Sequence, residues 1–205
     1  MASTADMGTN TETGTLLRSI TNDHREIFDC YDQYVKSQGD HDAQQRWSNQ
    51  LAWEVARHSV GEELVVYPLL EKHLGADGKK MADEDRAEHQ EVKKLLAKLE
   101  GTSAGSAEHA AILKSVIDNL KPHIEGEEKH DFPLLERVLS SAESKEAAVK
   151  FYKTKQFAPT RAHPSAPNKP PFETLAGFMA APLDKLKDAF SKFPTEEQRE
   201  VAGKN

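Results

Sequence analysis

The sequence predicts an all-α protein, an up-down four-helix bundle with additional C-terminal helices after a proline-rich linker. Three observations predict this fold. Four stretches repeat apolar residues every three or four positions, short polar segments join these stretches, and glycine and proline are few before residue 158. At 205 residues the chain can form one substantial domain with a tail or a small appendage.

The N-terminal part should consist of a disordered tail followed by the first helix of the bundle. Residues 1–13 are rich in Thr, Ser, Gly and Asp and offer almost nothing to bury. The bundle itself should span residues 14–140. From Leu16 an apolar stripe continues toward Gly39, where the first helix should end. His24 belongs to this stripe, so we expect its side chain to face the interior.

The second helix should begin after Asp40, kink at Pro68 and end at Gly75. Its inward stripe is interrupted at successive turns by three polar residues, which are Glu54, His58 and Glu62. Burying these groups without partners would cost several kcal/mol. The pattern therefore predicts that something inside the bundle binds them.

The third and fourth helices repeat this arrangement. The third should run from about residue 83 to residue 100, with His89 among its apolar residues. The loop GTSAGS then ends it. The fourth helix should begin near Ala107, and its inward stripe includes His123 and Glu127.

The chain continues beyond the bundle with three further segments. Residues 141–157 should form a fifth helix, and residues 158–171, with five prolines in fourteen positions, should form an extended linker. Residues 172–193 are apolar at helical spacing and should form one or two amphipathic helices broken at Pro182. This last segment could dock on the bundle, or it could contact a protein partner or a second copy of the chain.

Charge and composition exclude several classes of protein. The formal net charge of -7 argues against a nucleic-acid or anionic-membrane partner, and Asp184 and Asp188 offset the neighbouring lysines where a lipid-binding helix would be basic. Cys30 is the single cysteine, so neither an intramolecular disulfide nor a cysteine zinc site can form. We find no secretory signal and no apolar stretch near the roughly 20 residues that span a bilayer. A cytoplasmic protein is expected, with a nuclear location left open.

Two segments of the chain are nearly the same. One reads HSVGEELVVYPLLE from His58 to Glu71, and the other reads HIEGEEKHDFPLLE from His123 to Glu136. Eight of the fourteen positions are identical when His58 is aligned with His123. The same offset relates two earlier histidines, His24 and His89, so each half carries a histidine and then, at the same distance along the chain, an HxxxE motif. This repeat predicts a doubled site.

The chemistry of the repeat favours a dinuclear metal site. In HxxxE the two side chains lie on adjacent turns of one helical face, so both can reach one ion, or the carboxylate can bridge to a second ion. Imidazole and carboxylate suit iron, manganese or zinc, and the lack of thiolates disfavours copper(I) and iron-sulfur clusters. A single inward histidine is more often a core residue, but a set repeated at one fixed offset favours metal. The predicted ligands are His24, His58, Glu62, His89, His123 and Glu127, with Glu62 and Glu127 bridging.

Several other side chains could complete or support the site. The candidates are Glu54, Asp85 and His130 as extra ligands or outer supports, Glu63 and Glu128 as supports of the histidines, and Tyr31 as a donor into the site. Each has a plainer alternative: a surface or capping role for the charged groups, and a core role for the tyrosine. The remaining histidines lie at helix ends or in loops and should be exposed; they are His41, His73, His109 and His163.

The paired HxxxEE…(Y/F)PLL segments resemble those of the hemerythrin-like proteins, the HHE cation-binding family, and the resemblance covers about residues 14–140. It implies a four-helix bundle that holds a non-heme di-iron centre. The cofactors would be two iron ions, Fe2+ or Fe3+, with a bridging oxo, hydroxo or water species; manganese and zinc are less favoured. Ferritin-like di-iron bundles place Glu three residues before His, whereas here His precedes Glu by four.

The resemblance also implies a place for each ligand. The matched positions are, in helix order, His24, then His58 with Glu62, then His89, and then His123 with Glu127. Oxygen-carrying hemerythrins have a fifth histidine on the third helix, one turn from the other. This chain has Asp85 one turn before its histidine, a departure that speaks against reversible oxygen carriage. Because the first half has Ile20 at that position, the two metals should be chemically unequal.

The resemblance implies three functions. The first is a protein that binds dioxygen, peroxide or nitric oxide, for oxygen, iron or redox sensing or handling. The second is a di-iron oxidase, monooxygenase or peroxidase that acts on a small molecule, for which no catalytic residue is assigned. The third is an iron sensor or buffer that binds a partner through residues 172–193. The pattern leaves open the organic substrate, the resting redox state and the oligomeric state.

Overall fold

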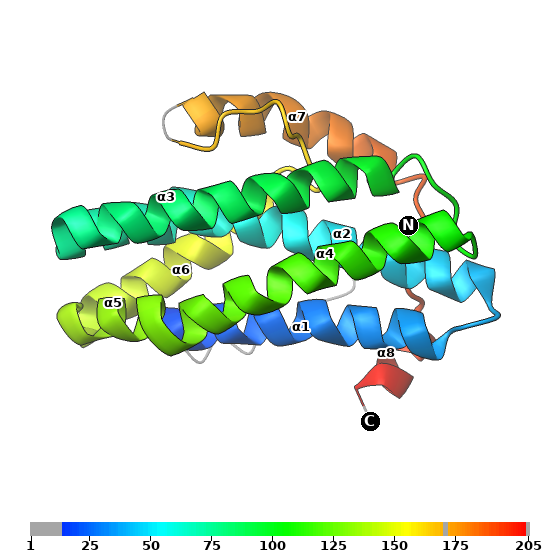
Figure 1. Ribbon diagram of the computed structural model, residues 1–205, viewed down its shortest axis with the longest axis horizontal. Helices are drawn as coiled ribbons and strands as arrows, with labels where there is room; N and C mark the ends of the chain where they lie inside the picture. The colour runs from blue at the N-terminus through cyan, green and yellow to red at the C-terminus, as the bar shows by residue number, and fades with distance from the viewer. Residues whose placement is uncertain (1–13, 170–171, 204–205) are drawn as a thin grey trace, which may run out of the picture.

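The fold is an up-down four-helix bundle, as predicted. The computed structural model describes residues 14–169 and 172–203, with the backbone alone at 172–178. The long helices are α1 (Leu16–Lys36), α2 (His41–Gly61), α3 (Tyr67–Leu99) and α4 (Ala107–Gly126), and successive helices run antiparallel (Figure 1). These described residues contain no strand. The tail expected at residues 1–13 lies outside them.

Local sequence sets the ends of the first two helices. The Thr15 side chain accepts a hydrogen bond from the Arg18 backbone N–H, and the Asp40 side chain accepts one from Ala43. Both are preferred residues at the start of a helix. Gly39 lies between the helices at φ 94°, in the left-handed region that favours glycine. The chain therefore reverses direction, and α2 returns alongside α1.

A wide π-helical turn follows both α2 and α4. The turn η1 spans Glu62–Val66, and η2 spans Glu127–Asp131. In η1 the Tyr67 N–H donates to the Glu62 carbonyl five residues earlier, and η2 makes the equivalent bond. Pro68 follows directly; proline has no N–H to donate and crowds the carbonyl four residues before it. The predicted kink thus takes the form of a π turn, which is frequent at functional sites.

The helix α3 contains a sharp break. Gly75 has φ 60° and ψ -127°, so the second helix of the bundle ends there, as predicted. The third helix starts directly after it, and the predicted start near Asp83 is wrong. Gly78 explains the difference, because a Cβ at this position would lie 2.0 Å from the Leu70 carbonyl oxygen. A glycine lets the two helical segments approach closely enough to join without a loop.

Two apolar clusters fill the interior of the bundle. The first includes Ile27, Leu51, Val92 and Leu120, and the second includes Ile20, Tyr67, Phe132 and Phe151. On α1, His24 lies one turn after a residue of the second cluster and one turn before a residue of the first. The predicted histidines therefore form a polar layer between the two clusters.

The fifth helix predicted at residues 141–157 is α6 in the structure, and it covers one side of this layer. The short helix α5 (Phe132–Val138) continues from η2, and α6 (Ser141–Phe157) then packs against α1, α2 and η1. Ser144 joins α6 to the start of the bundle, because its hydroxyl accepts a hydrogen bond from the Leu16 N–H and donates one to Glu136. The buried face of α6 thus belongs to the second apolar cluster.

Gly61 allows α6 to pack this closely, and a matched pair of substitutions tests it. We expect Gly61→Ala to destabilise the protein by about 1–3 kcal/mol, because the new Cβ would lie 2.7 Å from the Phe151 ring. Gly126, its counterpart in the second half of the repeat, has no atom within 4 Å of such a Cβ. Gly126→Ala should stabilise by about 0.5–1 kcal/mol through helix propensity. Urea unfolding measures both, and equal effects would contradict this packing.

Residues 158–169 form turns that pack between the bundle and α7 (Phe172–Asp188). The buried Asp184 carboxylate on α7 holds this segment. It accepts hydrogen bonds from two successive backbone N–H groups, those of Thr160 and Arg161, at 3.2 Å each, and lies 2.9 Å from His163 Nε2. In Figure 1 the segment and α7 lie over α3.

Helix α7 differs from the sequence prediction in two ways. It continues through Pro182, so the predicted break is wrong; Ala181 and Asp184 on either side are both buried, which holds the two halves in line. Asp184 and Asp188 face the 158–169 segment and so do not offset the neighbouring lysines at the surface. The outward face of α7 leaves three large apolar side chains exposed, which are Met179, Leu183 and Leu186, and Phe190 is exposed in the turn directly after the helix.

The described chain finishes with a short helix, α8 (Glu196–Ala202), which Thr195 caps. Arg199 of α8 donates a hydrogen bond to Gln50 of α2, so the C-terminal segment returns to the bundle. Within the described residues, every helix is too short or too polar to cross a membrane.

Candidate metal centre

Each helix of the bundle places one histidine in the polar layer. His24 from α1 and His58 from α2 pack edge to face, with ring centroids 4.8 Å apart and an interplanar angle of 70°. His89 from α3 and His123 from α4 repeat this geometry at 4.8 Å and 67°. All four side chains are at most 4% exposed. The sequence repeat therefore produces two matching histidine pairs.

The carboxylate of Glu62 lies between the two pairs. Its Oε2 is 3.1 Å from His58 Nε2, in the first pair, and 3.4 Å from His89 Nε2, in the second. Its Oε1 is 3.8 Å from His24 Nε2. Glu62 comes from the π turn directly after α2 and is fully buried. One carboxylate thus faces histidines of both pairs.

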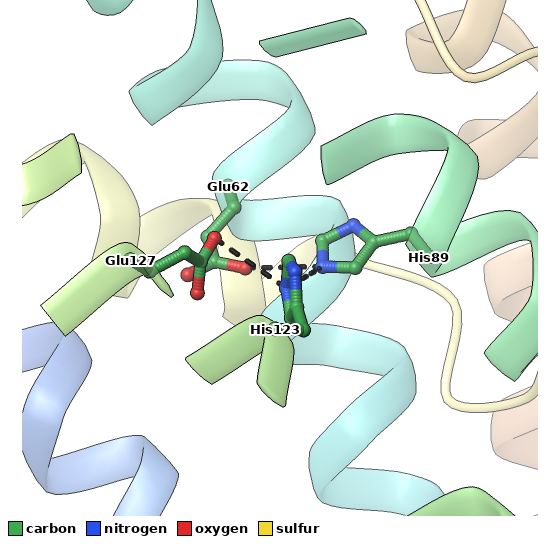
Figure 2. A group of neighbouring side chains, drawn as sticks. All are labelled: Glu62, His89, His123 and Glu127. Carbon is green, nitrogen blue, oxygen red and sulfur yellow. Dashed lines mark hydrogen bonds and ion pairs between the residues drawn. The ribbon is translucent and has the colours of Figure 1, made fainter. Parts of the chain in front are cut away.

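Glu127 occupies the equivalent position in the second half. Its Oε2 lies 3.5 Å from His24 Nε2, and its Oε1 lies 3.5 Å from His123 Nε2. Figure 2 shows Glu62, His89, His123 and Glu127 converging from their separate elements. The six predicted ligands form two groups that share one carboxylate and have spacings suited to metal: His24, His58 and Glu62; and Glu62, His89, His123 and Glu127.

Buried polar atoms without hydrogen-bond partners concentrate at this site. They include both oxygens of Glu62, Glu127 Oε2, His24 Nε2 and His58 Nε2. Interior polar atoms are normally paired, because an unpaired one costs about 1–3 kcal/mol. Imidazole nitrogen and carboxylate oxygen are donors that suit iron, manganese or zinc. A metal therefore fits these residues, since it would supply the missing partners.

In each of the four histidines of the polar layer, the second ring nitrogen, Nδ1, contacts a carboxylate. The Nδ1–oxygen distances are 2.8 Å for His24 with Glu128, 3.3 Å for His58 with Asp23, 3.0 Å for His89 with Glu63 and 2.8 Å for His123 with Glu88. A neutral histidine that donates from Nδ1 presents its Nε2 lone pair to the interior. Metal-binding histidines are commonly oriented in this way.

Two of these four carboxylates were candidates in the sequence, and two were not. Glu63 and Glu128 were left between support of the histidines and surface ion pairs, and both contact histidine rings; Glu63 also pairs with Lys93. Asp23 and Glu88 were missed. A signal for them exists, because each directly precedes a predicted histidine and the two occupy equivalent positions in the two halves of the repeat.

A buried tyrosine that was not among the candidates lies beside the second pair. Tyr67 is fully buried, and its hydroxyl donates to Glu127 Oε1 at 3.3 Å and lies 3.3 Å from His89 Nε2. Its counterpart in the other half is Phe132, which has no hydroxyl. The two halves of the site are therefore chemically different, although their histidines match.

The buried charges shift the pKa values of the metal-free centre. Burial alone would lower the pKa of His24, but contacts with Glu127 and Glu62 raise it well above its usual range. In the same way Glu62 and Glu63 outweigh burial and raise the pKa of His89 to about 10. Without metal, protons thus compensate the carboxylates, and metal binding must release protons.

We expect the metal-free protein to lose stability as the pH rises from 7 to 10. The folded state holds a proton on His89 up to a pKa of about 10, whereas a histidine in the unfolded chain has a pKa of about 6.5. This stabilisation is complete below the unfolded pKa and disappears as the pH passes through the folded one. Thermal unfolding with a chelator present measures the effect. Equal midpoints at pH 7 and pH 10 would contradict it.

Asp85 lies on the outer side of the second histidine pair. Its Oδ1 is 3.9 Å from His123 Nδ1, and its other oxygen is buried without a hydrogen-bond partner. Burial, with the negative charges of Glu127 and Asp131, raises the pKa of Asp85 to about 9. Together with Glu88 and His123 it forms a third group of atoms within metal-ligand spacing. Such a carboxyl group takes up either a proton or a cation.

Three other candidates make their contacts elsewhere. Glu54 accepts a hydrogen bond from the glutamine one turn before it, at 2.8 Å. His130 is at the surface and contacts Asp131, and Tyr31 stacks on Tyr34 with centroids 6.3 Å apart. The structure therefore does not bring these three side chains together with the six predicted ligands.

The expectation of solvent exposure is wrong for His109. This side chain is 1% exposed, with Nε2 at 2.9 Å from Ser48 Oγ and Nδ1 at 2.9 Å from Thr102 Oγ1. Burial lowers the pKa of His109, which favours the neutral ring. It joins the start of α4 to α2 and to the loop after α3, a packing contact that a position at a helix end does not reveal.

Comparisons with known proteins give two matches that agree with this geometry. The model of the hemerythrin HHE cation binding domain family matches residues 15–135. An uncharacterized hemerythrin-like protein of Schizosaccharomyces pombe is 52% identical over 176 residues, which is 86% of each chain. No solved structure matches the chain.

Proposed function

Because this chain belongs to the hemerythrin HHE cation-binding family, we propose that it is a non-heme di-iron protein that binds dioxygen, peroxide or nitric oxide. Binding would serve oxygen, iron or redox sensing or handling. The family and the buried cluster of histidines and glutamates indicate metal binding. We propose further that the metal is iron, that two ions bind, and that the ligand is one of these small molecules.

One observation carries this proposal. The two histidine pairs have the same internal geometry, and two buried carboxylates lie between them. A single ion could not use four histidines that face inward as two separate pairs, whereas two ions bridged by carboxylates could. The doubled arrangement therefore favours a dinuclear site over a mononuclear one.

We assign each residue a role on this basis. The proposed ligands are His24 and His58 for the first ion, His89 and His123 for the second, and Glu62 and Glu127 as bridges. The carboxylates at Nδ1 orient the histidines, and Asp85 ligates the second ion or supports it from outside. When bound, a ferrous pair supplies the electrons and open positions that dioxygen, peroxide or nitric oxide requires.

Burial favours a small ligand over an organic substrate. Each of the six proposed ligands is at most 4% exposed, so a larger molecule could reach the centre only if the bundle opened. A diatomic molecule or peroxide needs far less space. The Tyr67 hydroxyl, already a donor to Glu127, is close enough to donate a hydrogen bond to a guest beside the second pair. This supports ligand binding ahead of the oxidase alternative.

The surface of α7 supports iron sensing with partner binding as a second candidate function. Its outward face exposes Met179, Leu183 and Leu186, and Phe190 in the turn directly after the helix adds a fourth exposed apolar side chain. Single exposed apolar residues are common, but a row of them at helical spacing is typical of an interaction surface. In this function, iron loading would stabilise the bundle on which α7 docks and so alter partner binding.

Reaction of the ferrous protein with oxygen tests the leading function. Protein loaded with Fe(II) without oxygen should show a new absorption band when it is mixed with oxygen in a stopped-flow instrument. A long-lived band that disappears under vacuum indicates carriage, and a transient band followed by oxidised iron indicates an oxidase. Iron-loaded protein whose spectrum does not respond to oxygen, peroxide or nitric oxide would reject the function.

A pair of variants tests the metal site separately. The double variant His58→Ala and His123→Ala should retain well under one iron per chain. The matched control replaces two surface histidines, His41→Ala and His130→Ala, and should bind iron as the unmodified protein does. Equal iron contents in the two variants would show that the buried histidines do not bind it.

A further inference from the structure

The helix α6 lies beyond residues 15–135, the part that the family model matches, yet it packs beside the first histidine pair. Phe151 of α6 is 1% exposed, and its ring meets the His58 ring edge to face, with centroids 6.0 Å apart at 87°. Gly61, three residues after His58, leaves the space that the Phe151 ring fills. One wall of the first metal position is therefore built by a helix outside the matched region.

Lys155, one turn further along α6, reaches the same histidine through Asp23. Its Nζ forms an ion pair with Asp23 Oδ2, the oxygen that lies 3.3 Å from His58 Nδ1. Lys155 is 8% exposed, and its backbone carbonyl accepts a hydrogen bond from Arg57 Nε at 2.8 Å. The lysine is thus fixed at both its backbone and its charged end.

The second histidine pair has an equivalent lysine that comes from within the bundle. Lys93 of α3 donates to both oxygens of Glu63 at 2.8 Å, and Glu63 contacts His89 Nδ1. The other two supporting carboxylates are partly open to solvent, with exposed side-chain fractions of 33% for Glu128 and 56% for Glu88. Each pair therefore has one solvated carboxylate and one that a lysine holds, and the lysine is buried at the first pair and partly buried at the second.

We propose that α6 is part of the metal centre, and that Lys155 is a positioning residue that holds His58 through Asp23 and sets the affinity of the first metal position. This inference rests on the proposed function. With Lys155 present, Asp23 stays against Nδ1 and His58 Nε2 faces Glu62 at 3.1 Å. Without it, Asp23 loses its cation and can turn toward solvent, which frees the imidazole ring. Loss of such outer support typically lowers metal affinity about 10–100-fold.

The test measures ferrous ion binding to the full-length chain without oxygen, by competition with a chelator. Lys155→Met should weaken one of the two ions about 10–100-fold, and Lys155→Arg, which keeps the charge, should restore binding. Lys153→Met is the matched control, because Lys153 lies on the exposed side of the same helix. Lys93→Met should weaken one ion by a similar factor, but at the other position.

Two backgrounds assign each effect to a position. In His123→Ala, which retains the first position, Lys155→Met should weaken the remaining ion and Lys93→Met should not. In His58→Ala, which retains the second position, Lys93→Met should weaken the remaining ion and Lys155→Met should not. If Lys155→Met does not fold by circular dichroism, Gly61→Ala replaces it, since the added methyl group would lie 2.7 Å from Phe151 and 3.3 Å from Lys155.

The outcomes separate this inference from the proposed function. If the unmodified chain binds no iron, the proposed function fails. If it binds two ions and Lys155→Met binds both with unchanged affinity, or weakens both equally, α6 has no specific role in the first position. Weakening of the first position alone, with recovery in Lys155→Arg, supports the inference.

Discussion

Glu127→Gln is expected to remove tight binding of both ions together. The two carboxylate oxygens of Glu127 face different histidine pairs, each at 3.5 Å from an Nε2 atom. Glutamine keeps the size of the side chain, but it has one neutral oxygen and a donor amide in place of a bridging anion. Loss of an outer support costs about 10–100-fold in affinity, so loss of a shared ligand should cost more than about 100-fold.

The matched control for this variant is Glu125→Gln. Glu125 precedes Glu127 by two residues, lies at the surface and pairs with Lys129. It should bind two ions with unchanged affinity. Iron content after equilibration against a chelator measures both variants. A Glu127→Gln protein that keeps one ion at full affinity would show that this carboxylate is an ordinary ligand of one metal and not a bridge.

Iron loading is expected to raise the unfolding midpoint by about 8–16 °C for each tightly bound ion. A ligand present at about 1,000 times its Kd stabilises the folded state by about 4 kcal/mol. In a domain of this size each kcal/mol shifts the midpoint by about 2–4 °C. The ions should stabilise the folded state because they supply partners to buried ligand atoms that otherwise lack them.

Calorimetry without oxygen, with Fe(II) or with a chelator, measures this shift. The double variant His58→Ala and His123→Ala should unfold at the same temperature under both conditions. A midpoint that rises equally in the unmodified protein and in the double variant would mean that iron stabilises the chain from another site.

The six proposed ligands could be predicted because the repeat acts through helical geometry. Residues four apart lie on one helical face, and the fixed offset that relates His58 to His123 gives the two halves the same register. The apolar stripes on both sides of each histidine then require that the ligands meet in one layer. The fold follows from the same stripes, which explains why the bundle and the convergence of these six side chains were predicted together.

Other parts of the site depend on packing between helices, which periodicity does not describe. Tyr67 and Phe132 are equivalent apolar positions in the pattern, and only the packed structure reveals that the hydroxyl reaches Glu127. Asp23 and Glu88 lie next to predicted histidines in the sequence but serve histidines on the following helix. A residue that acts across a helix interface is invisible to spacing along one helix.

The C-terminal segments were the least predictable for the same reason. The charge pattern of α7 suggested that Asp184 and Asp188 lie beside lysines at the surface. In the fold Asp184 is 1% exposed and binds the 158–169 segment, and Asp188 pairs with Arg161. The prolines of residues 158–171 predicted only an extended linker. They could not reveal that the Asp184 carboxylate binds this segment, because Asp184 belongs to a helix that comes later in the chain.

Crystals of iron-loaded protein, measured at the iron absorption edge, test the central claim most directly. The anomalous difference map should contain two peaks about 3.5–4 Å apart, one beside His24 and His58 and the other beside His89 and His123, with Glu62 and Glu127 between them. A single peak, or iron bound only outside this layer, would contradict a dinuclear centre built from the repeated HxxxE motifs.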